Sequence, residues 1–147
     1  MIDIQKISAQ ESFIVRHPVL RNGKPIESCY FKGDELESTE HFGLFENNQI
    51  KGVISLFKNN NVLFEDKHQA QIRGMAVLEN NQGNGFGRLL VAHSEQILKA
   101  QNISLIWFNA RENAVGFYRK MGYEIIGKSF DIPGVGMHYV MWKKLRR

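Results

Sequence analysis

Cysteine, proline and long apolar runs are scarce in this sequence. Its 147 residues contain one cysteine, Cys29, and three prolines. A lone thiol excludes an internal disulfide, as is usual for proteins kept in a reducing compartment. The segment MIDIQKISAQ has no apolar run after basic residues, and no stretch approaches the length needed to cross a bilayer. These absences argue against secretion and membrane insertion, and we expect one cytoplasmic domain over residues 1–147.

Neither sign of charge dominates the composition. The formal net charge is +4 and the sequence pI is near 9.3. A nucleic-acid-binding face, a polyanionic small ligand and a mildly basic surface without a specific partner are all compatible with these values. The only dense basic run is WKKLRR, and no helix-turn-helix, zinc-finger or RNP pattern is present, which predicts no nucleic-acid partner. The five histidines and Cys29 lack metal-ligand spacing, which predicts no metal.

The hydrophobic pattern changes along the chain from helical to strand-like spacing. Ser8, followed three residues later by Glu11, predicts a capped helix in SAQESFIVRHPVL. Residues 21–39 are polar and indicate a loop or lid. The elements expected after them are a β-hairpin in HFGLFENNQIKGVISLF, a strand over about 69–78, a helix over 84–101, a strand over 103–109, a helix in ENAVGFYRKMG ended by Gly122, and the strands YEIIGKSF and VGMHYVMWKKL. This order predicts an α/β or α+β chain with a mixed sheet.

Three glycines at alternate positions, Gly83, Gly85 and Gly87, stand where a strand gives way to the helix of 84–101. They do not match the dinucleotide fingerprint G-x-G-x-x-G, and no Gly-Lys-Ser/Thr of a P-loop follows. The pattern that remains is Q-x-x-G-x-G, beginning at Gln82. Unpaired N–H groups at a helix start, the helix dipole and the missing side chains suit a pyrophosphate. A tight turn without a ligand is the alternative.

A second motif, YRKMGY over residues 118–123, ends the next predicted helix with the pattern Y-x-x-x-G-[FY]. Together with Q-x-x-G-x-G and its flanking strands, it resembles the GNAT superfamily of acetyl-CoA-dependent N-acetyltransferases over about residues 69–145. The segments NAR (109–111) and IPGVGMHYVMWKKL further resemble the ElaA-like members. The resemblance implies a GNAT fold, α/β of the α+β type: a central, mixed, mostly antiparallel sheet of about six to seven strands with a V-shaped splay, flanked by about four helices.

The resemblance also implies acetyl-CoA as the acyl donor. In the family, the glycine turn takes the coenzyme A pyrophosphate, and two splayed strands, here 69–78 and 103–109, hold pantetheine. The residues assigned to the coenzyme in this way are Met75, Ala76, Val77, Gln82, Gly83, Asn84, Gly85, Phe86, Gly87, Arg88, Asn109, Asn113, Phe117 and Tyr118. The Met75 N–H is the expected donor to the thioester carbonyl. Many members carry an asparagine three residues before the helix alanine, where this chain has Arg111.

Tyr118 is the expected general acid, because a phenol beside the sulfur can donate a hydrogen bond or proton to the leaving thiolate. The alternative is that Tyr118 packs beside Phe117 as part of the helix core. Several GNATs carry a glutamate base four residues before the thioester-polarising residue. The equivalent here is Gln71, which cannot act as a base.

Four other residues are candidates for the base: His138, Glu112, His41 and Glu40. His138 is preferred because it lies on the last strand, in the region that flanks the acceptor cleft in this fold, and because imidazole titrates near neutrality. It is also a candidate for binding the acceptor. Strand alternation predicts that Arg73 shares a face with Gln71 and Met75, where it can bind an acidic group of the acceptor or form a surface ion pair.

The enzyme hypothesis is direct transfer of an acetyl group from acetyl-CoA to a primary amine of a small molecule or peptide. The alternative is a non-catalytic module that binds or senses acyl-CoA, a hypothesis motivated by the glutamine at position 71. We expect residues 10–45 and 128–138 to shape the acceptor site. The resemblance is also compatible with a homodimer.

Overall fold

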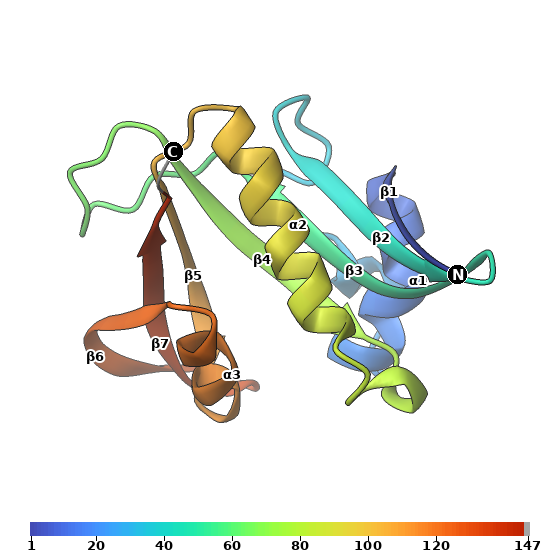
Figure 1. Cartoon of the computed structure of the whole chain (residues 1–147). Helices are drawn as coiled ribbons and strands as arrows, with labels where there is room; N and C mark the ends of the chain where they lie inside the picture. Colours follow the sequence, from blue (N-terminus) through green and yellow to red (C-terminus); the bar gives the residue numbers. More distant parts are fainter. Residues whose placement is uncertain (146–147) are drawn as a thin grey trace.

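The computed structural model describes residues 1–145, which form one seven-stranded sheet in the order β1-β2-β3-β4-β5-β7-β6 (Figure 1). The strands are β1 (Ile2–Ile7), β2 (Glu40–Glu46), β3 (Gln49–Phe57), β4 (Gln69–Val77), β5 (Leu105–Arg111), β6 (Glu124–Ile132) and β7 (Gly136–Lys144). The helices are α1 (Ala9–Leu20), α2 (Phe86–Ala100) and α3 (Val115–Lys120), with 3-10 turns η1 (Ile26–Cys29), η2 (Glu79–Asn81) and η3 (Glu112–Ala114). All neighbouring strands are antiparallel except β4 and β5. The predicted α+β class and mixed sheet are confirmed. The described residues form three α-helices rather than the predicted number of about four.

Helices cover both faces of the sheet (Figure 1). Leu90 and Leu98 of α2 are fully buried in the larger apolar core, which α3 extends. On the opposite face, Val15 of α1 packs with Val53 of β3 and Ala76 of β4. The buried leucine and valine side chains each contribute about 1.5–3 kcal/mol by leaving water, and they hold the central strands between α1 and α2. None of the helices within residues 1–145 combines the length and apolarity needed to span a membrane.

The chain begins with a strand that the hydrophobic pattern did not predict. β1 pairs with β2 from Ile2 opposite Glu46 to Ile7 opposite His41. It lies at the edge of the sheet and buries only Ile7, so it lacks the alternation of a half-buried strand.

The capped helix that follows β1 is confirmed. The Ser8 hydroxyl accepts the Glu11 N–H at 3.1 Å, and the Glu11 carboxylate accepts the Ser8 N–H at 2.9 Å. This reciprocal pair satisfies two donors that a helix start leaves open, and it fixes where α1 begins.

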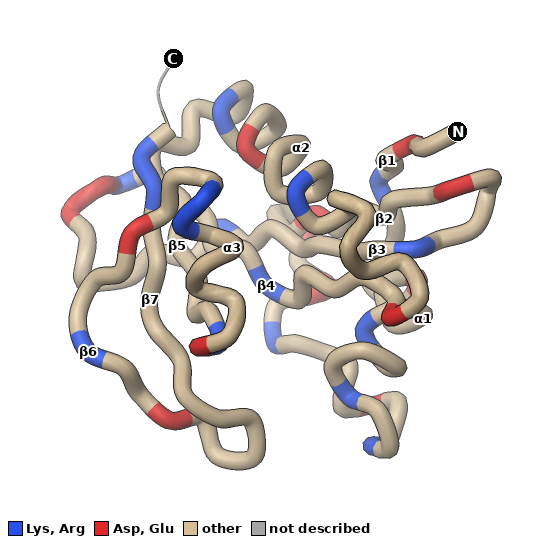
Figure 2. The backbone as a smooth tube through the Cα atoms, turned by 60° about the horizontal axis from the view of Figure 1, so that its bottom comes forward, with Lys and Arg blue, Asp and Glu red and all other residues tan. Residues whose placement is uncertain are grey.

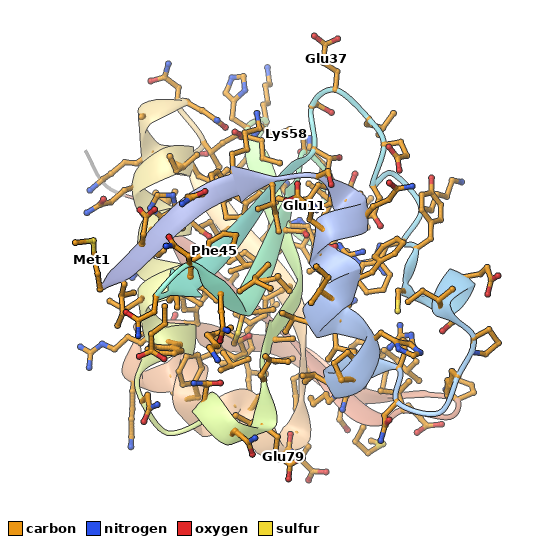
Figure 3. All side chains as sticks on the ribbon, turned by 90° about the vertical axis from the view of Figure 1, so that its right-hand side faces the viewer. Met1, Glu11, Glu37, Phe45, Lys58 and Glu79 are labelled. Atoms are coloured by element: carbon orange, nitrogen blue, oxygen red, sulfur yellow. The ribbon has the colours of Figure 1, made fainter. Side chains whose placement is uncertain are left out.

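The segment of residues 21–39 folds back beside α1 (Figure 3). Arg16 of α1 is fully buried and donates to both carboxylate oxygens of Asp34, at 2.7 and 3.1 Å, and to the Ser55 hydroxyl at 2.9 Å. The same carboxylate accepts the Phe31 N–H at 2.8 Å. A buried ion pair with this geometry specifies one position for the chain around it, so the predicted loop or lid is anchored to the core at this point.

β4 and β5 meet only where both strands begin. Parallel pairing joins Gln69 to Leu105, Ala70 to Ile106 and Gln71 to Trp107, and then stops. Figure 1 shows the two arms that result, with β1–β4 in one and β5–β7 in the other, and Figure 2 shows the opening from below. The predicted V-shaped splay is confirmed, and it leaves two strand edges facing a gap.

Candidate active site

A cavity of about 370 Å³ lies in the opening between the diverging strands. Its walls come from the end of α1 and the segment after it, from β4 and β5, from the start of α3, and from the β6–β7 hairpin. This volume lies at the small end of the range for ligand pockets. The predicted site residues that border it are Arg73, Met75, Asn109, Tyr118 and His138.

A bulge at Gly74 interrupts β4 beside the cavity. The pairing with β3 passes from Arg73 opposite Ser55 to Ala76 opposite Val53, so one residue of β3 stands opposite two of β4. Gly74 adopts a φ of +64°, in the left-handed region where a side chain is strained. A bulge of this kind redirects the side chains that follow it, and here it does so at the point where the strands separate.

The bulge places Arg73 and Met75 on opposite faces of the sheet. Met75 packs into the core under α2, and its methyl group lies 3.4 Å from the position of a Cβ on Gly87. The Arg73 guanidinium instead lies over the Phe31 ring on the α1 side, 4.5 Å from the ring centroid. The prediction that Arg73 and Met75 share a face is therefore wrong, because alternation predicts faces only along an uninterrupted strand.

The glycine turn presents open space and unpaired donors. Gly83 and Gly85 have φ values of +86° and +80°, and no atom lies within 4 Å of a Cβ built on either. The Gln82 amide donates to the Val77 carbonyl at 3.0 Å and ties the turn to the end of β4. Within residues 1–145, the backbone N–H groups of 83–88 have no backbone acceptor. Donors of this kind at the start of a 15-residue helix suit an anion such as a phosphate.

The other residues assigned to the coenzyme differ in what they offer. Phe86 is buried in the core, so only its backbone can reach a ligand at the turn. The side chains of Asn84 and Arg88 are exposed. Asn113 is exposed in η3 and does not border the cavity. Asn109 borders the cavity. Its two sequence neighbours in β5 belong to the core under α2, and because side chains of a strand point to alternate faces, Asn109 lies on the face away from that core.

Tyr118 combines a packed ring with a hydroxyl that is open to a ligand. The ring is 7% exposed, and its centroid lies 4.3 Å from that of Phe108 and 5.0 Å from that of Phe117. Burial raises the pKa of Tyr118 to about 12. Its hydroxyl has no hydrogen-bond partner within the part of the chain that the structure describes, and the residue borders the cavity. Tyr118 is therefore both part of the core and a protonated donor at neutral pH.

Tyr123, at the end of the same motif, has a structural role. Its hydroxyl donates to Glu95 of α2 at 2.8 Å, and Lys143 of β7 lies 3.1 Å from the same carboxylate oxygen. Burial, and then the charge of Glu95, hold the pKa of Tyr123 far above its usual value. Gly122 before it has a φ of +95°, which confirms the predicted helix stop. This cluster fixes α3, and with it Tyr118, against α2 and β7.

His138 is the one base candidate that borders the cavity. It is 5% exposed, stands directly opposite Arg111, and its Nδ1 lies 2.8 Å from the Gly136 carbonyl oxygen. That carbonyl can only accept, so Nδ1 carries the proton and Nε2 offers a lone pair. Gln71 also borders the cavity, where its amide oxygen accepts from the Asn59 amide at 3.0 Å.

The remaining base candidates lie elsewhere. Glu40 is 3.7 Å from Lys58 in a surface ion pair, and Glu112 is exposed in η3. His41 is buried, with Nδ1 2.6 Å from the Ser55 hydroxyl and Nε2 3.0 Å from the Asp34 carbonyl oxygen. Across residues 1–145, no three His, Cys, Asp or Glu side chains gather in a way that could hold a metal ion.

Among the residues of the cavity wall that were not predicted from the sequence, Arg21, Phe31 and Arg111 matter most to its charge. Arg21 and Phe31 lie in the segment read as a loop or lid, and Arg111 ends β5. No short motif marks Arg21 or Phe31, because the end of α1 and the folding of the segment after it bring them to the cavity. Arg111 lies in the NAR segment, where it was noted only as a departure from the family pattern. The signal available for the first two was weaker: a phenylalanine and an arginine within a polar stretch that was expected to shape the acceptor site.

Comparisons with known proteins identify the family of this chain. The model of the Acetyltransferase (GNAT) family matches residues 7–123. YitI from Bacillus subtilis (strain 168), an uncharacterized N-acetyltransferase, is 34% identical over 146 residues, which cover 99% of this chain and 98% of YitI.

Two solved structures share the fold. Escherichia coli ElaA has a TM-score of 0.76 at 16% identity, covering 97% of this chain and 99% of its own. An aminoglycoside 6'-N-acetyltransferase complexed with coenzyme A has a TM-score of 0.78 at 12% identity, covering 99% of this chain and 98% of its own. At these identities the two structures show the fold alone. The family match and the similarity to YitI show more: this chain belongs to the GNAT family of N-acetyltransferases.

Proposed function

We propose that the protein transfers an acetyl group from acetyl-CoA directly to a primary amine. The observation that carries the proposal is the convergence of both sequence motifs on the cavity in the splay. Tyr118 of the second motif borders this cavity, and Met75, which also borders it, packs against Gly87 of the glycine turn. His138 borders it as well, on β7. A donor site, a proton donor and a proton acceptor therefore lie around one small volume.

The glycine turn is the proposed holder of the coenzyme A pyrophosphate. Gly83 and Gly85 leave the approach open, the N–H groups of 83–88 supply donors, and Gln82 holds the turn to β4. The unpaired strand edges beyond Gln71 suit pantetheine, whose amide groups need hydrogen-bond partners. Acetyl-CoA supplies the reactive thioester, and we assign polarisation of its carbonyl to the Met75 N–H.

Tyr118 is the proposed hydrogen-bond donor to the leaving sulfur. As the amine nitrogen bonds to the carbonyl carbon, the carbon–sulfur bond breaks and its electron pair goes to the sulfur. A thiol has a pKa of about 8.5, well below the value of about 12 for Tyr118. The phenol therefore stabilises the thiolate by donating a hydrogen bond, without losing its own proton for good.

His138 is the proposed acceptor of the proton that the amine must lose. An ammonium group has no lone pair, so it must be deprotonated before attack. His138 Nδ1 is occupied by the Gly136 carbonyl, which leaves Nε2 to take the proton directly or through a water.

A non-catalytic module that binds acyl-CoA is the second candidate. It is favoured by one observation: within residues 1–145, no Asp or Glu borders the cavity, and Gln71 occupies the place of the glutamate base. An assay of thiol release over a set of amines separates the two candidates. Turnover that falls in Tyr118→Phe would dismiss the non-catalytic one.

Calorimetric titration with acetyl-CoA tests the donor site. Gly85→Asp and Gly85→Asn are a matched pair, because both side chains tolerate a positive φ and differ chiefly in charge. We expect the wild type to bind, and the Asp variant to lose at least about tenfold more affinity than the Asn variant, since the carboxylate repels the pyrophosphate. Equal losses would remove the turn as the phosphate site. A folded wild type that does not bind would overturn the proposed function.

A further inference from the structure

The acceptor side of the cavity carries positive charge without any acidic side chain. Arg21, Arg73 and Arg111 border the cavity together with His138, and none of the described residues that border it is Asp or Glu. The whole chain has 15 acidic and 19 basic residues, so a scarcity of carboxylates does not explain this wall. Basic groups gathered around one pocket attract anionic ligands.

The carboxylate whose charge acts on Arg73 is already occupied. Asp34 is 3% exposed and is held bidentately by Arg16. Within residues 1–145, Arg73 and Arg111 form no ion pair with a carboxylate. Their charges are therefore available to a ligand.

An aromatic ring holds the arginines close together. The guanidinium carbons of Arg16, Arg73 and Arg21 lie 4.1, 4.5 and 5.4 Å from the Phe31 ring centroid. Stacking on a ring fixes a guanidinium without neutralising it and leaves its edge free for hydrogen bonds. Burial, and then the charge of Arg16, lower the pKa of Arg73. The surroundings thus disfavour a further cation and favour an anion at this position.

The two sides of the cavity also lie in the right order for an amine that bears such an anion. Tyr118 and Met75 border it from the α2 and α3 side, whereas Arg73 faces α1. His138 stands directly opposite Arg111 across β7 and β5, so a proton acceptor and a guanidinium are neighbours. The amine of a bound molecule can thus reach His138 while its other end contacts arginine.

We propose that the acceptor is a small primary amine that carries an oxyanion group, either carboxylate or phosphate, held by Arg73 together with Arg21 and Arg111. This inference rests on the proposed acetyl transfer and names its acceptor class. A guanidinium offers two parallel donors to either oxyanion, which fixes the orientation of the amine as well as its affinity. Polycationic amines are disfavoured by the same charges.

A matched set of amines at saturating acetyl-CoA tests the proposal. The set contains β-alanine with a carboxylate, O-phosphoethanolamine with a phosphate, 3-aminopropanol as the neutral match and 1,3-diaminopropane as the cationic one. We expect kcat/KM for at least one anionic amine to exceed that for 3-aminopropanol by about tenfold or more, and the diamine to be slowest. The better of the two anionic amines identifies the oxyanion.

The opposite order, or turnover of 3-aminopropanol without turnover of either anionic amine, would overturn this proposal. A failure of the proposed function is a different result, because it would show either no binding of acetyl-CoA by calorimetry or coenzyme binding without turnover of any amine in the set.

Arginine variants test which side chains read the anion. Arg73→Gln and, at the exposed end of β5, Arg111→Gln should each lower the ratio of kcat/KM for the anionic amine to that for 3-aminopropanol by about tenfold, mainly through KM. Arg119→Gln, at an exposed position of α3 outside the cavity, is the matched control and should leave the ratio unchanged. Arg111→Gln keeps the test valid if Arg73→Gln does not fold. If neither Arg73→Gln nor Arg111→Gln changes this ratio, the proposal is overturned.

Discussion

The two sides of the cavity are built from different chemical groups. On the side of α2 and α3, the wall is apolar apart from the Tyr118 hydroxyl, and the adjoining glycine turn offers main-chain N–H groups. On the side of α1, the wall includes the long charged side chains Arg21 and Arg73, stacked on Phe31. In the proposed function, one side binds through backbone and the other through side chains.

This difference explains why one side can be recognised in the sequence and the other cannot. A backbone site needs glycines at fixed spacing, because Gly83 and Gly85 must hold a positive φ and leave space for the ligand. A side-chain site needs only that charged groups meet in space, from any positions that the fold brings together. We therefore expect the donor side to tolerate little change, and the acceptor side to determine which amine reacts.

The largest expected effect comes from unbalancing the buried charges behind the acceptor side. Asp34→Asn leaves the Arg16 guanidinium, which is fully buried, without its counter-charge. We expect the free energy of unfolding to fall by about 3–5 kcal/mol, measured by urea denaturation.

A double variant controls for this loss. Arg16→Met combined with Asp34→Leu removes both charges, and it should recover most of the stability, since a buried ion pair is often no better than apolar packing. Asp34→Asn with wild-type stability would show that the buried Arg16 guanidinium does not depend on the charge of Asp34.

The next largest effect concerns the reacting atoms. Tyr118→Phe removes the donor to the leaving sulfur and should lower kcat by about 100-fold, while acetyl-CoA binding by calorimetry stays close to that of the wild type. Tyr123→Phe is the matched control, because its hydroxyl binds Glu95 rather than the cavity. We expect that control to lose stability more than kcat. Equal effects on kcat would show that Tyr118 acts only through packing.

The raised pKa of Tyr118 also predicts how stability depends on pH. A tyrosine in the unfolded chain loses its proton near pH 10, whereas Tyr118 in the folded protein keeps it up to about pH 12. Between these values the folded state binds more protons, so the free energy of unfolding falls as pH rises, by up to about 1.4 kcal/mol per pH unit. Between pH 9 and 12, the free energy of unfolding of Tyr118→Phe should decline less steeply with pH than that of the wild type. An unchanged slope would contradict the raised pKa of Tyr118.

A smaller effect is expected at the boundary between the two sides. Gly74→Ala puts a Cβ at φ +64° and 3.0 Å from both Arg16 Nε and the Phe31 ring. We expect a loss of about 2 kcal/mol in the free energy of unfolding. Gly134→Ala, at φ +78° with open space around it, carries the backbone strain alone and should cost less. If Gly74→Ala and Gly134→Ala lose the same free energy of unfolding, the side chains of Arg16 and Phe31 are packed only loosely against Gly74.

The sequence predicted the features whose causes are local. The Ser8–Glu11 capping box, the glycine turn that leads into α2 and the helix stop at Gly122 each depend on residues within one turn of the chain, and the backbone shape of all three is confirmed. The V-shaped splay followed from the family resemblance and is also confirmed.

The features that were missed have causes distant in the sequence. β1 exists because β2 offers an edge to its short, exposed run. The bulge at Gly74 depends on how β4 aligns with β3, and an alternating pattern cannot reveal it. Phe31 reaches the cavity because the Asp34 carboxylate binds both its N–H and the Arg16 guanidinium, which folds the segment after α1 back. The acceptor side is therefore the part of the site that the structure adds.

The smallest expected effect tests whether the two sides can be perturbed separately. Ser8→Ala removes the cap of α1, the helix that carries Arg16, and should cost about 1 kcal/mol, seen as a fall in Tm of about 2–4 °C. Ser38→Ala, at an exposed position, is the matched control and should change nothing measurable. Because α1 carries Arg16 and leads directly into Arg21 of the acceptor side, KM for the amine should rise slightly while acetyl-CoA affinity changes less. Weaker coenzyme binding with an unchanged KM for the amine would show that α1 supports the donor side instead.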